Sequence, residues 1–236
     1  MSGKKIALIF VMAIIAAAIV FYIANPSSFS GADSTQTSSV SNDDLTVSLE
    51  AASAPAQTPD VLHEYVIGED DAPITVVEYA SYSCGHCGTF FRDVYPQVKE
   101  KLVDTGKLKF IFKDFPLNGP ALMASKLTHC VDESRHKGMV AMLFETQENW
   151  MASQDRLKDF SQMARLAGLS EQAFGECLDN ENLDTAILSV MQEAKDQYEI
   201  SSTPSFVFFN SAGRIEKFTG VRSVEEFERV IEKLSE

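Results

Sequence analysis

The chain has 236 residues, 45% of them hydrophobic, and a formal net charge of −14. This hydrophobic share is ordinary for a globular protein and is enough for a sizeable core. The acidic balance argues against a nucleic-acid-binding protein, because such proteins usually carry a basic stripe and the sequence has none. We therefore expect no nucleic-acid partner, and the acidity serves solubility.

The first residues are typical of a targeting segment. Two lysines precede an uncharged apolar run over residues 6–24. This run is near the lower length limit for spanning a bilayer and is longer than the apolar region of most signal peptides. We interpret residues 1–25 as a signal anchor or a signal peptide that forms one transmembrane helix. An uncleaved anchor is preferred, because Ser30 and Ala32, which suit cleavage, lie far past the run.

Residues 26–60 are predicted to be a disordered linker. Ser, Thr, Ala, Asp, Gln and Pro dominate this segment, and large apolar residues are few. Such a composition cannot bury enough surface to offset the entropy of ordering. The lysines before the apolar run would stay in the cytoplasm, so the linker would hold a domain of residues 61–236 outside it.

The domain begins with a β-branched run, ITVVEYA at residues 74–80, that is suited to a buried strand. A helix is expected to start at the cysteine of the following turn. The remaining elements are expected in this order: a strand at 107–112, a helical block at about 117–199, strands at 206–209 and 214–218, and a helix at 224–234. Together they indicate an α/β fold.

The helical block is too long to be a simple connection. A right-handed crossover between parallel strands needs only about a dozen residues. We therefore interpret residues 117–199 as an inserted all-helical subdomain that lies over the active end of the sheet. Within it, Leu157, Phe160, Met163 and Leu166 are expected to form one stripe, and Ser170 is a candidate N-cap.

Cys84 and Cys87 flank Gly85 and His86, and this C-x-x-C motif has three interpretations. A zinc clip would need four ligands, and the pair supplies only two. A purely structural bridge would close a very small loop and stabilise little. A redox-active disulfide, Cys84–Cys87, remains the favoured interpretation, and we expect neither a metal nor a cofactor.

The position of the motif indicates which cysteine reacts. Cys84 lies where a strand ends and a helix begins, so backbone N–H groups and the helix dipole favour its thiolate. His86 adds positive potential when protonated. Both effects stabilise the reduced form and make the disulfide more oxidising. Cys87, one turn inside the helix, is expected to be more buried and to act as the resolving thiol.

Thr203 and Pro204 directly precede a predicted strand. Proline lacks an N–H group, so it cannot sit inside a β-ladder, but it can end a loop at the edge of a strand. An ordinary trans-proline turn is the alternative. In combination with an upstream C-x-x-C motif, the pattern is more specific.

The motif E-Y-x-S-x-x-C-x-x-C, the Thr-Pro pair before a strand and the helical insertion resemble the DsbA family. These are thioredoxin-fold disulfide oxidoreductases, and the likeness is to the alphaproteobacterial type over about residues 60–236. The resemblance implies a thioredoxin-like fold in which Pro204 is cis and faces the cysteines. It also implies that the backbone of Thr203 binds an extended substrate peptide.

The resemblance further implies a role for Glu78, six positions before Cys84. A buried carboxyl group behind the active site could take or relay the proton of Cys87. Lys113 is its candidate charge partner. The chain departs from the best-known DsbA proteins in carrying Gly85-His86 where they have Pro-His, which leaves the oxidising strength open.

Cys130 and Cys177 both fall in the helical block. They are either two free buried thiols or a second disulfide, and disulfides persist outside the cytoplasm. The disulfide is preferred, since some alphaproteobacterial DsbA proteins have such a pair. His63, His129 and His136 show no metal-binding spacing and are expected to be structural or solvated.

The predicted function is a periplasmic thiol:disulfide oxidoreductase, tethered to the inner membrane or released if the first segment is cleaved. Its substrates would be unfolded or folding exported proteins with free cysteines. A DsbB-like membrane partner would reoxidise the site. The alternatives are a reductase or isomerase that uses the same residues, and a peptide-binding chaperone without turnover.

Overall fold

The computed structural model describes residues 61–236. The anchor predicted at residues 1–25 and the linker predicted at 26–60 lie outside the described residues. Among the helices in 61–236, none combines the length and the apolar character that crossing a bilayer requires.

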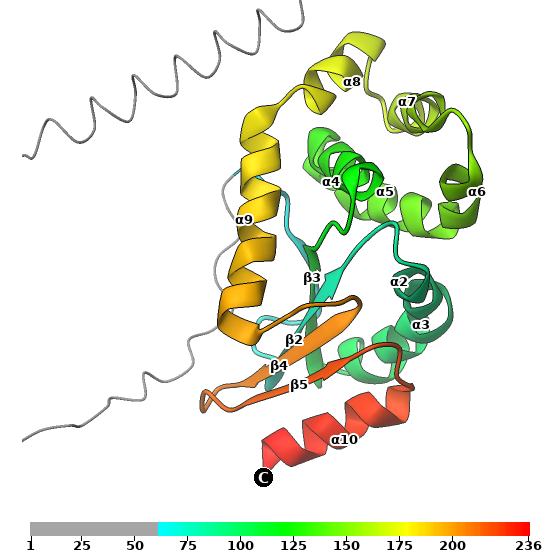
Figure 1. The fold of residues 1–236 in the computed structure, drawn as a ribbon. Coiled ribbons are helices and arrows are strands. Elements are labelled where there is room, and N and C mark those ends of the chain that lie inside the picture. The colour runs from blue at the N-terminus through cyan, green and yellow to red at the C-terminus, as the bar shows by residue number, and fades with distance from the viewer. Residues whose placement is uncertain (1–60) are drawn as a thin grey trace, which may run out of the picture. The chain divides into compact units, whose positions relative to one another are not determined.

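Five strands form a single sheet in the order β1-β3-β2-β4-β5 (Figure 1). Strands β2 and β3 are parallel, and the other neighbouring pairs are antiparallel. The strands are β1 (Tyr65–Ile67), β2 (Ile74–Ala80), β3 (Leu108–Asp114), β4 (Ser205–Asn210) and β5 (Ile215–Thr219). The sequence did not indicate β1, because three residues are too short to show an alternating pattern.

The helix after β2 is continuous but not uniformly α-helical. It consists of α2 (Gly85–Thr89), a π-helical turn η1 (Phe90–Val94), α3 (Tyr95–Val98) and a second π-helical turn η2 (Lys99–Val103). Pro96 lies just after the first π-helical turn. Proline has no N–H group, and its ring clashes with the carbonyl four residues earlier, so a wider turn before it relieves the clash.

The segment between β3 and β4 is helical, as predicted. Its helices are α4 (Gly119–Cys130), α5 (Glu133–Glu145), α6 (Gln147–Ala152), α7 (Arg156–Leu166), α8 (Glu171–Leu178) and α9 (Glu181–Tyr198). Ser170 caps α8, because its side chain accepts a hydrogen bond from the Ala173 N–H at 3.1 Å. Figure 1 shows α4 to α8 beyond the end of the sheet where α2 begins.

The stripe expected on α7 is only half correct. Phe160 and Met163 are buried, whereas Leu157 and Leu166 are 53% and 77% exposed. An α-helix has 3.6 residues per turn, so each step of three residues falls about 60° short of a full turn. Three such steps place Leu157 and Leu166 on opposite sides of the helix.

The core occupies both faces of the sheet. On one face, Val76, Phe110 and Phe206 belong to an aromatic-rich cluster that also includes residues of α2, η1 and the C-terminal helix α10 (Val224–Ser235). On the other face, Val77 and Val207 pack with residues of α9. The sheet is thus covered on both sides, and the loops at its α2 end remain available for a site.

Candidate active site

Cys84 stands at the junction of β2 and α2. It has an extended backbone, with φ −83° and ψ 116°, and it is the residue that precedes the first helical turn. Its N–H donates to the Ser81 carbonyl at 3.0 Å, and its carbonyl accepts from the Gly88 N–H at 3.1 Å. Cys84 is half-buried and Cys87 is fully buried, and the two thiols are unbridged. The structure therefore shows the reduced form of the site.

Hydrogen bonds at this junction lower the pKa of Cys84 to about 5 from an ordinary value of 9.0. The largest cause is the Cys87 thiol, and the backbone N–H groups of Cys87 and His86 act in the same direction, while burial opposes them. The Cys84 thiol is thus largely deprotonated at neutral pH. A thiolate is the reactive form in disulfide exchange, and a stabilised thiolate makes the disulfide a stronger oxidant.

Cys87 has the opposite character. Burial raises its pKa, and so do its hydrogen bond to Cys84 and the negative charge of Glu78. Cys87 is therefore protonated at neutral pH in the reduced form. Cys87 is thus more buried than Cys84, as the sequence predicts.

Glu78 lies on β2 and is 3% exposed. Burial raises the pKa of this carboxyl well above its ordinary value, and the charge of Cys84 raises it further. A buried carboxyl group that is easily protonated, and that acts electrostatically on both thiols, is suited to exchanging a proton with Cys87.

Lys113 is not the charge partner of Glu78. In the sheet, Glu78 pairs with Phe112 and Lys113 pairs with Tyr79. Successive side chains of a strand point to opposite faces, so Lys113 and Glu78 lie on different sides of the sheet. Burial lowers the pKa of Lys113, and the charges of Glu193 and Glu64 act in the opposite direction.

Glu78→Gln tests the proton-transfer role. At neutral pH we expect exchange to slow by up to about 10²-fold, because Cys87 loses the carboxyl group that exchanges a proton with it. Since folding raises the pKa of Glu78, its contribution to stability is present below pH 4.5 and is lost as the pH rises through the folded value. Urea unfolding should therefore find the variant more stable than the wild type at pH 8 and similar to it at pH 4. An unchanged exchange rate would contradict the proton-transfer role of Glu78. An unchanged dependence of stability on pH would contradict the raised pKa of its carboxyl group.

Thr203 and Pro204 face the cysteines from the loop before β4. The peptide bond between them is cis. The Cys84 thiol donates to the Thr203 carbonyl, with a sulfur–oxygen distance of 3.3 Å. The Pro204 carbonyl accepts from the Gly220 N–H at 2.8 Å, which fixes the loop to the end of β5. Two motifs that are far apart in the sequence thus meet at one point.

Sequence reasoning missed one residue of this site, Gln147 on α6. Its Nε2 donates to the Tyr82 carbonyl at 2.6 Å and to the Cys84 carbonyl at 2.8 Å. A glutamine in the first turn of a helix is ordinarily exposed, so no local pattern distinguishes it. The contact depends on how the inserted helices fold back over the sheet.

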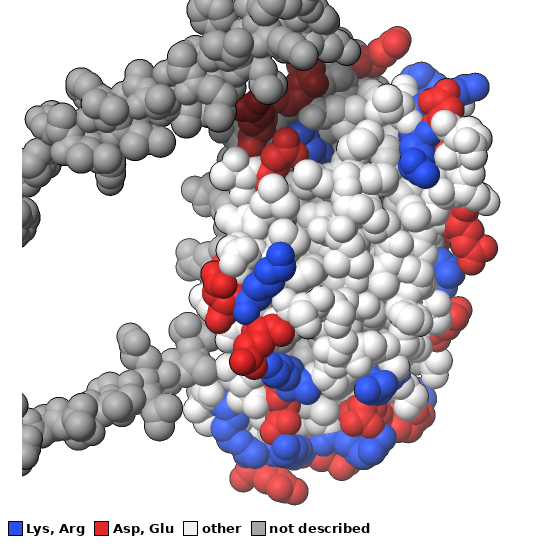
Figure 2. Space-filling view, in the orientation of Figure 1, with Lys and Arg blue, Asp and Glu red and all other residues white. Residues whose placement is uncertain are grey.

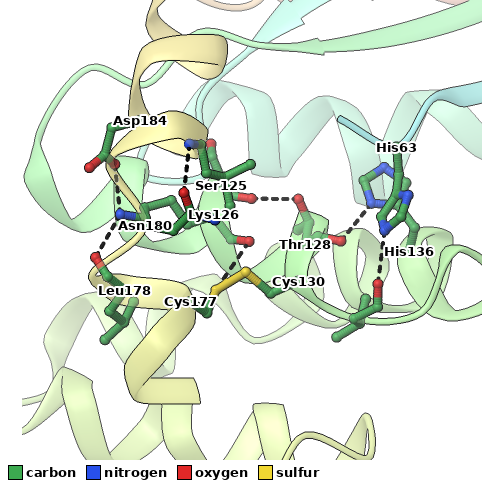
Figure 3. The surroundings of a disulfide bond; sticks show 12 residues. His63, Ser125, Lys126, Thr128, Cys130, His136, Cys177, Leu178, Asn180 and Asp184 are labelled. Atoms are coloured by element: carbon green, nitrogen blue, oxygen red, sulfur yellow. Dashed lines mark hydrogen bonds and ion pairs between the residues drawn. A yellow bond between two sulfur atoms is a disulfide. The ribbon is translucent and has the colours of Figure 1, made fainter. Parts of the chain in front are cut away.

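Cys130 and Cys177 form a disulfide between the last residue of α4 and α8 (Figure 3). The S–S distance is 2.10 Å and the Cα atoms are 6.0 Å apart. Next to it, the Lys126 ammonium, 3% exposed, donates to the Leu178 carbonyl at 2.6 Å and pairs with Asp184 at 2.9 Å. Covalent, ionic and hydrogen bonds therefore join α4 to the α8–α9 segment.

On the other side of this disulfide, three histidines lie together. The rings of His129 and His136 stack at 5.0 Å, and the ring of His63 is 5.5 Å from that of His136. His129 Nε2 is 2.8 Å from a carboxylate oxygen of Asp114. Sequence spacing did not reveal this cluster. Nevertheless, no set of three or more metal-binding side chains in residues 61–236 is arranged to hold an ion.

The cluster predicts an acid-sensitive fold. Burial lowers the pKa of His136 from 6.5 to about 4, although its bond to the Thr128 carbonyl opposes this shift. His136 thus contributes stability above pH 6.5 that is lost as the pH falls toward 4, at most about 3 kcal/mol. His136→Asn retains a donor to Thr128 and cannot titrate. Chemical unfolding at several pH values should show that the free energy of unfolding of this variant depends less on pH than that of the wild type. If the dependence is the same in both, His136 is not the source of the acid sensitivity.

Comparisons with known proteins agree with this geometry. A family model described as thioredoxin matches residues 60–233. The solved structure of Wolbachia pipientis alpha-DsbA1 is 31% identical and superposes with a TM-score of 0.65, covering 72% of this chain and 90% of that one. BdbD from Bacillus subtilis shares the fold. It is 23% identical and superposes with a TM-score of 0.59, covering 75% of this chain and 95% of that one.

A Rickettsia conorii protein, described as a candidate protein-disulfide oxidoreductase, is 24% identical over 175 residues. The matched residues are 74% of this chain and 61% of that relative, so the chain spans about three fifths of the relative's length. A C-x-x-C motif at a helix start opposite a cis-proline, on this sheet, defines a thioredoxin-fold dithiol site. The chain belongs to the thioredoxin family and, within it, to the DsbA type of thiol:disulfide oxidoreductase.

Proposed function

We propose that this protein is a periplasmic thiol:disulfide oxidoreductase that introduces disulfide bonds into exported proteins. The observation that carries the proposal is the contrast between its two thiols. The pKa of Cys84 is lowered to about 5, and that of its buried partner Cys87 is raised. This contrast stabilises the reduced site, so the oxidised site tends to accept electrons.

The reaction is two successive thiol–disulfide exchanges. A substrate thiolate attacks Cys84 in the oxidised site, a substrate–Cys84 disulfide forms, and the Cys84–Cys87 bond breaks. Cys87 leaves as a thiolate and takes a proton, for which Glu78 is the donor. A second substrate thiolate then attacks the substrate sulfur, and Cys84 leaves as a thiolate. The substrate loses two electrons and the site gains them.

The loop before β4 would hold the substrate backbone. The Thr203 carbonyl accepts from Cys84 only while Cys84 carries its thiol proton. As a thiolate, or when bonded to a substrate sulfur, Cys84 has no hydrogen to donate, so this carbonyl is available to a substrate N–H group. Backbone recognition of this kind tolerates many sequences, as an enzyme with diverse unfolded substrates requires.

The surface around the site suits such substrates. Figure 2 shows Lys, Arg, Asp and Glu mainly at the margins of this face, and the centre, around α2, is largely free of them. Leu117, in the loop between β3 and α4, is 50% exposed. Its neighbour Asn118 donates to the Ser83 hydroxyl beside Cys84 at 3.0 Å. An uncharged surface accepts unfolded chains of either charge.

Turnover requires reoxidation of Cys84–Cys87. We assign this step to a DsbB-like membrane partner, and the predicted anchor at residues 1–25 would keep the site close to it. The anchor, the partner and the periplasmic location rest on the sequence and on the family.

One observation favours a second candidate function. Gly85-His86 is the dipeptide typical of eukaryotic disulfide isomerases, and both residues are exposed in the structure. The same site would then act as an isomerase or reductase. A measured redox potential of Cys84–Cys87 distinguishes the oxidase from the isomerase or reductase. A peptide-binding chaperone is separated by the Cys84 variant described in the Discussion.

The direct test mixes the oxidised protein with a reduced, unfolded protein that has several cysteines, in the absence of oxygen. We expect two substrate thiols to disappear for each site that becomes reduced. Thiol labelling and mass spectrometry count both. If Cys84 and Cys87 stay oxidised while the substrate remains reduced, the proposed function is wrong.

A further inference from the structure

Gln147 connects the helical insertion to the redox site. It is 3% exposed, although it begins the short helix α6. Its amide nitrogen donates to two carbonyls of the loop that carries the nucleophile, at Tyr82 and Cys84. Both hydrogens of the amide are therefore used within a single turn of backbone.

The other end of the same side chain lies against α2. A Cβ atom placed on Gly88 would be 2.1 Å from the Gln147 Oε1 atom and 2.8 Å from a guanidinium nitrogen of Arg92. The φ angle of Gly88 does not lie in the left-handed region, so its backbone conformation does not require glycine. Glycine is required because there is no space for a Cβ atom. The amide of Gln147 thus lies directly on the first turn of α2.

This contact bears on the chemistry of Cys84. The Cys84 carbonyl accepts both the first backbone bond of α2, from Gly88, and the bond from Gln147. Fixing that peptide unit fixes the turn that follows it. The N–H groups of His86 and Cys87, which stabilise the Cys84 thiolate, belong to this turn. The amide also brings the positive end of its dipole to the backbone of Cys84.

We propose that Gln147 is a positioning residue of the redox site. Its amide holds the first turn of α2 in the orientation that stabilises the Cys84 thiolate, so the helical insertion helps to set the oxidising strength of the site. This inference rests on the proposed function, because oxidising strength matters only to an enzyme that accepts electrons from substrates.

A purely structural role is the competing explanation. Leaving two buried carbonyls without a donor would lower stability in any protein. Such a loss would not change the balance between thiol and thiolate at Cys84. The test must therefore measure that balance as well as stability.

Gln147→Met removes the amide and keeps a side chain of similar length. Ultraviolet absorbance of the thiolate should show the pKa of Cys84 rising by about one unit. At neutral pH, the equilibrium between the site and glutathione should shift about tenfold toward the disulfide form. The matched control is Gln172→Met, since Gln172 is exposed and its amide donates to Glu176 within α8, at 2.8 Å.

A second variant covers the case in which Gln147→Met does not fold. Gly88→Ala leaves the amide in the chain and displaces it, while alanine favours the helix by up to about 1 kcal/mol. We expect the same direction of change in the pKa of Cys84. Two constants decide the test: the acid dissociation constant of Cys84 and the equilibrium constant with glutathione. If both stay within about twofold of the wild type in every variant that folds, Gln147 is structural only and the inference is wrong.

The measurement is independent of the proposed function. Both readouts concern the isolated protein and need no substrate. If the wild type fails to oxidise substrates but Gln147→Met still shifts the Cys84 equilibrium, the proposed function fails and the positioning role stands. If the wild type oxidises substrates and the shift is absent, only the positioning role fails.

Discussion

Cys84→Ser is expected to abolish substrate oxidation. The serine hydroxyl cannot form a disulfide with a substrate sulfur, so the first exchange has no electrophile. The rate of disulfide formation in a reduced protein should fall to that of the buffer. Cys87→Ser is the informative companion, since it keeps the Cys84 thiolate and removes the thiol that can release a mixed disulfide. When this variant is mixed with a protein that already holds a disulfide, the Cys84 thiolate attacks one sulfur, the other leaves as a thiolate, and substrate–Cys84 adducts should accumulate on non-reducing gels.

The same variants separate catalysis from binding. If the protein were a chaperone that holds peptides beside Pro204, Cys84→Ser would still prevent aggregation of an unfolded protein and the wild type would show no thiol turnover. Residual oxidation in Cys84→Ser above the buffer rate would contradict the assignment of Cys84 as the cysteine that exchanges with the substrate.

Removing the second disulfide is expected to have the largest effect on stability. Cys130 and Cys177 are separated by 47 positions. A cross-link of this span removes loop entropy from the unfolded chain worth about 4 kcal/mol in the simple model, and measured values are commonly about 2–4 kcal/mol. The double variant Cys130→Ala/Cys177→Ala should therefore lower the free energy of unfolding by about 2–4 kcal/mol in urea titrations.

The redox site supplies the control for this experiment. Cys84 and Cys87 do not belong to the cross-link, so the double variant should still oxidise substrates at temperatures where it is folded. A loss of less than about 0.5 kcal/mol would mean that the bridge adds no stability, contrary to this expectation.

The sequence was sufficient for the parts of the site that local chemistry determines. A C-x-x-C motif between a β-branched run and a helical pattern predicts the position of Cys84, since strand and helix periodicities are local signals. The insertion was recognisable because the segment between β3 and β4 is far longer than a connection between strands requires. The expectation that this segment joins parallel strands was wrong, because β2 is parallel to β3 and antiparallel to β4. The pairing of Thr203 and Pro204 with the cysteines followed from the family resemblance.

Other features depend on contacts between distant segments, and no local pattern encodes them. Gln147 reaches its two carbonyls across more than sixty positions of chain. His63, His129 and His136 come together only because the segment before β1 lies beside α4 and α5. The assignment of Lys113 failed for a different reason. Strand register decides which face a side chain takes, and the register of β2 against β3 was not known.

The central claim is that Cys84–Cys87 works as an oxidant. The measurement that tests it most directly is the equilibrium of this disulfide with glutathione, together with the titration of the Cys84 thiolate. We expect a potential of about −180 to −120 mV, between those of disulfide isomerases and strongly oxidising DsbA proteins. We also expect a Cys84 pKa near the value of about 5 that the geometry supports. A potential as low as that of thioredoxin, about −270 mV, would show that the site is built to reduce disulfides and would contradict the proposed function.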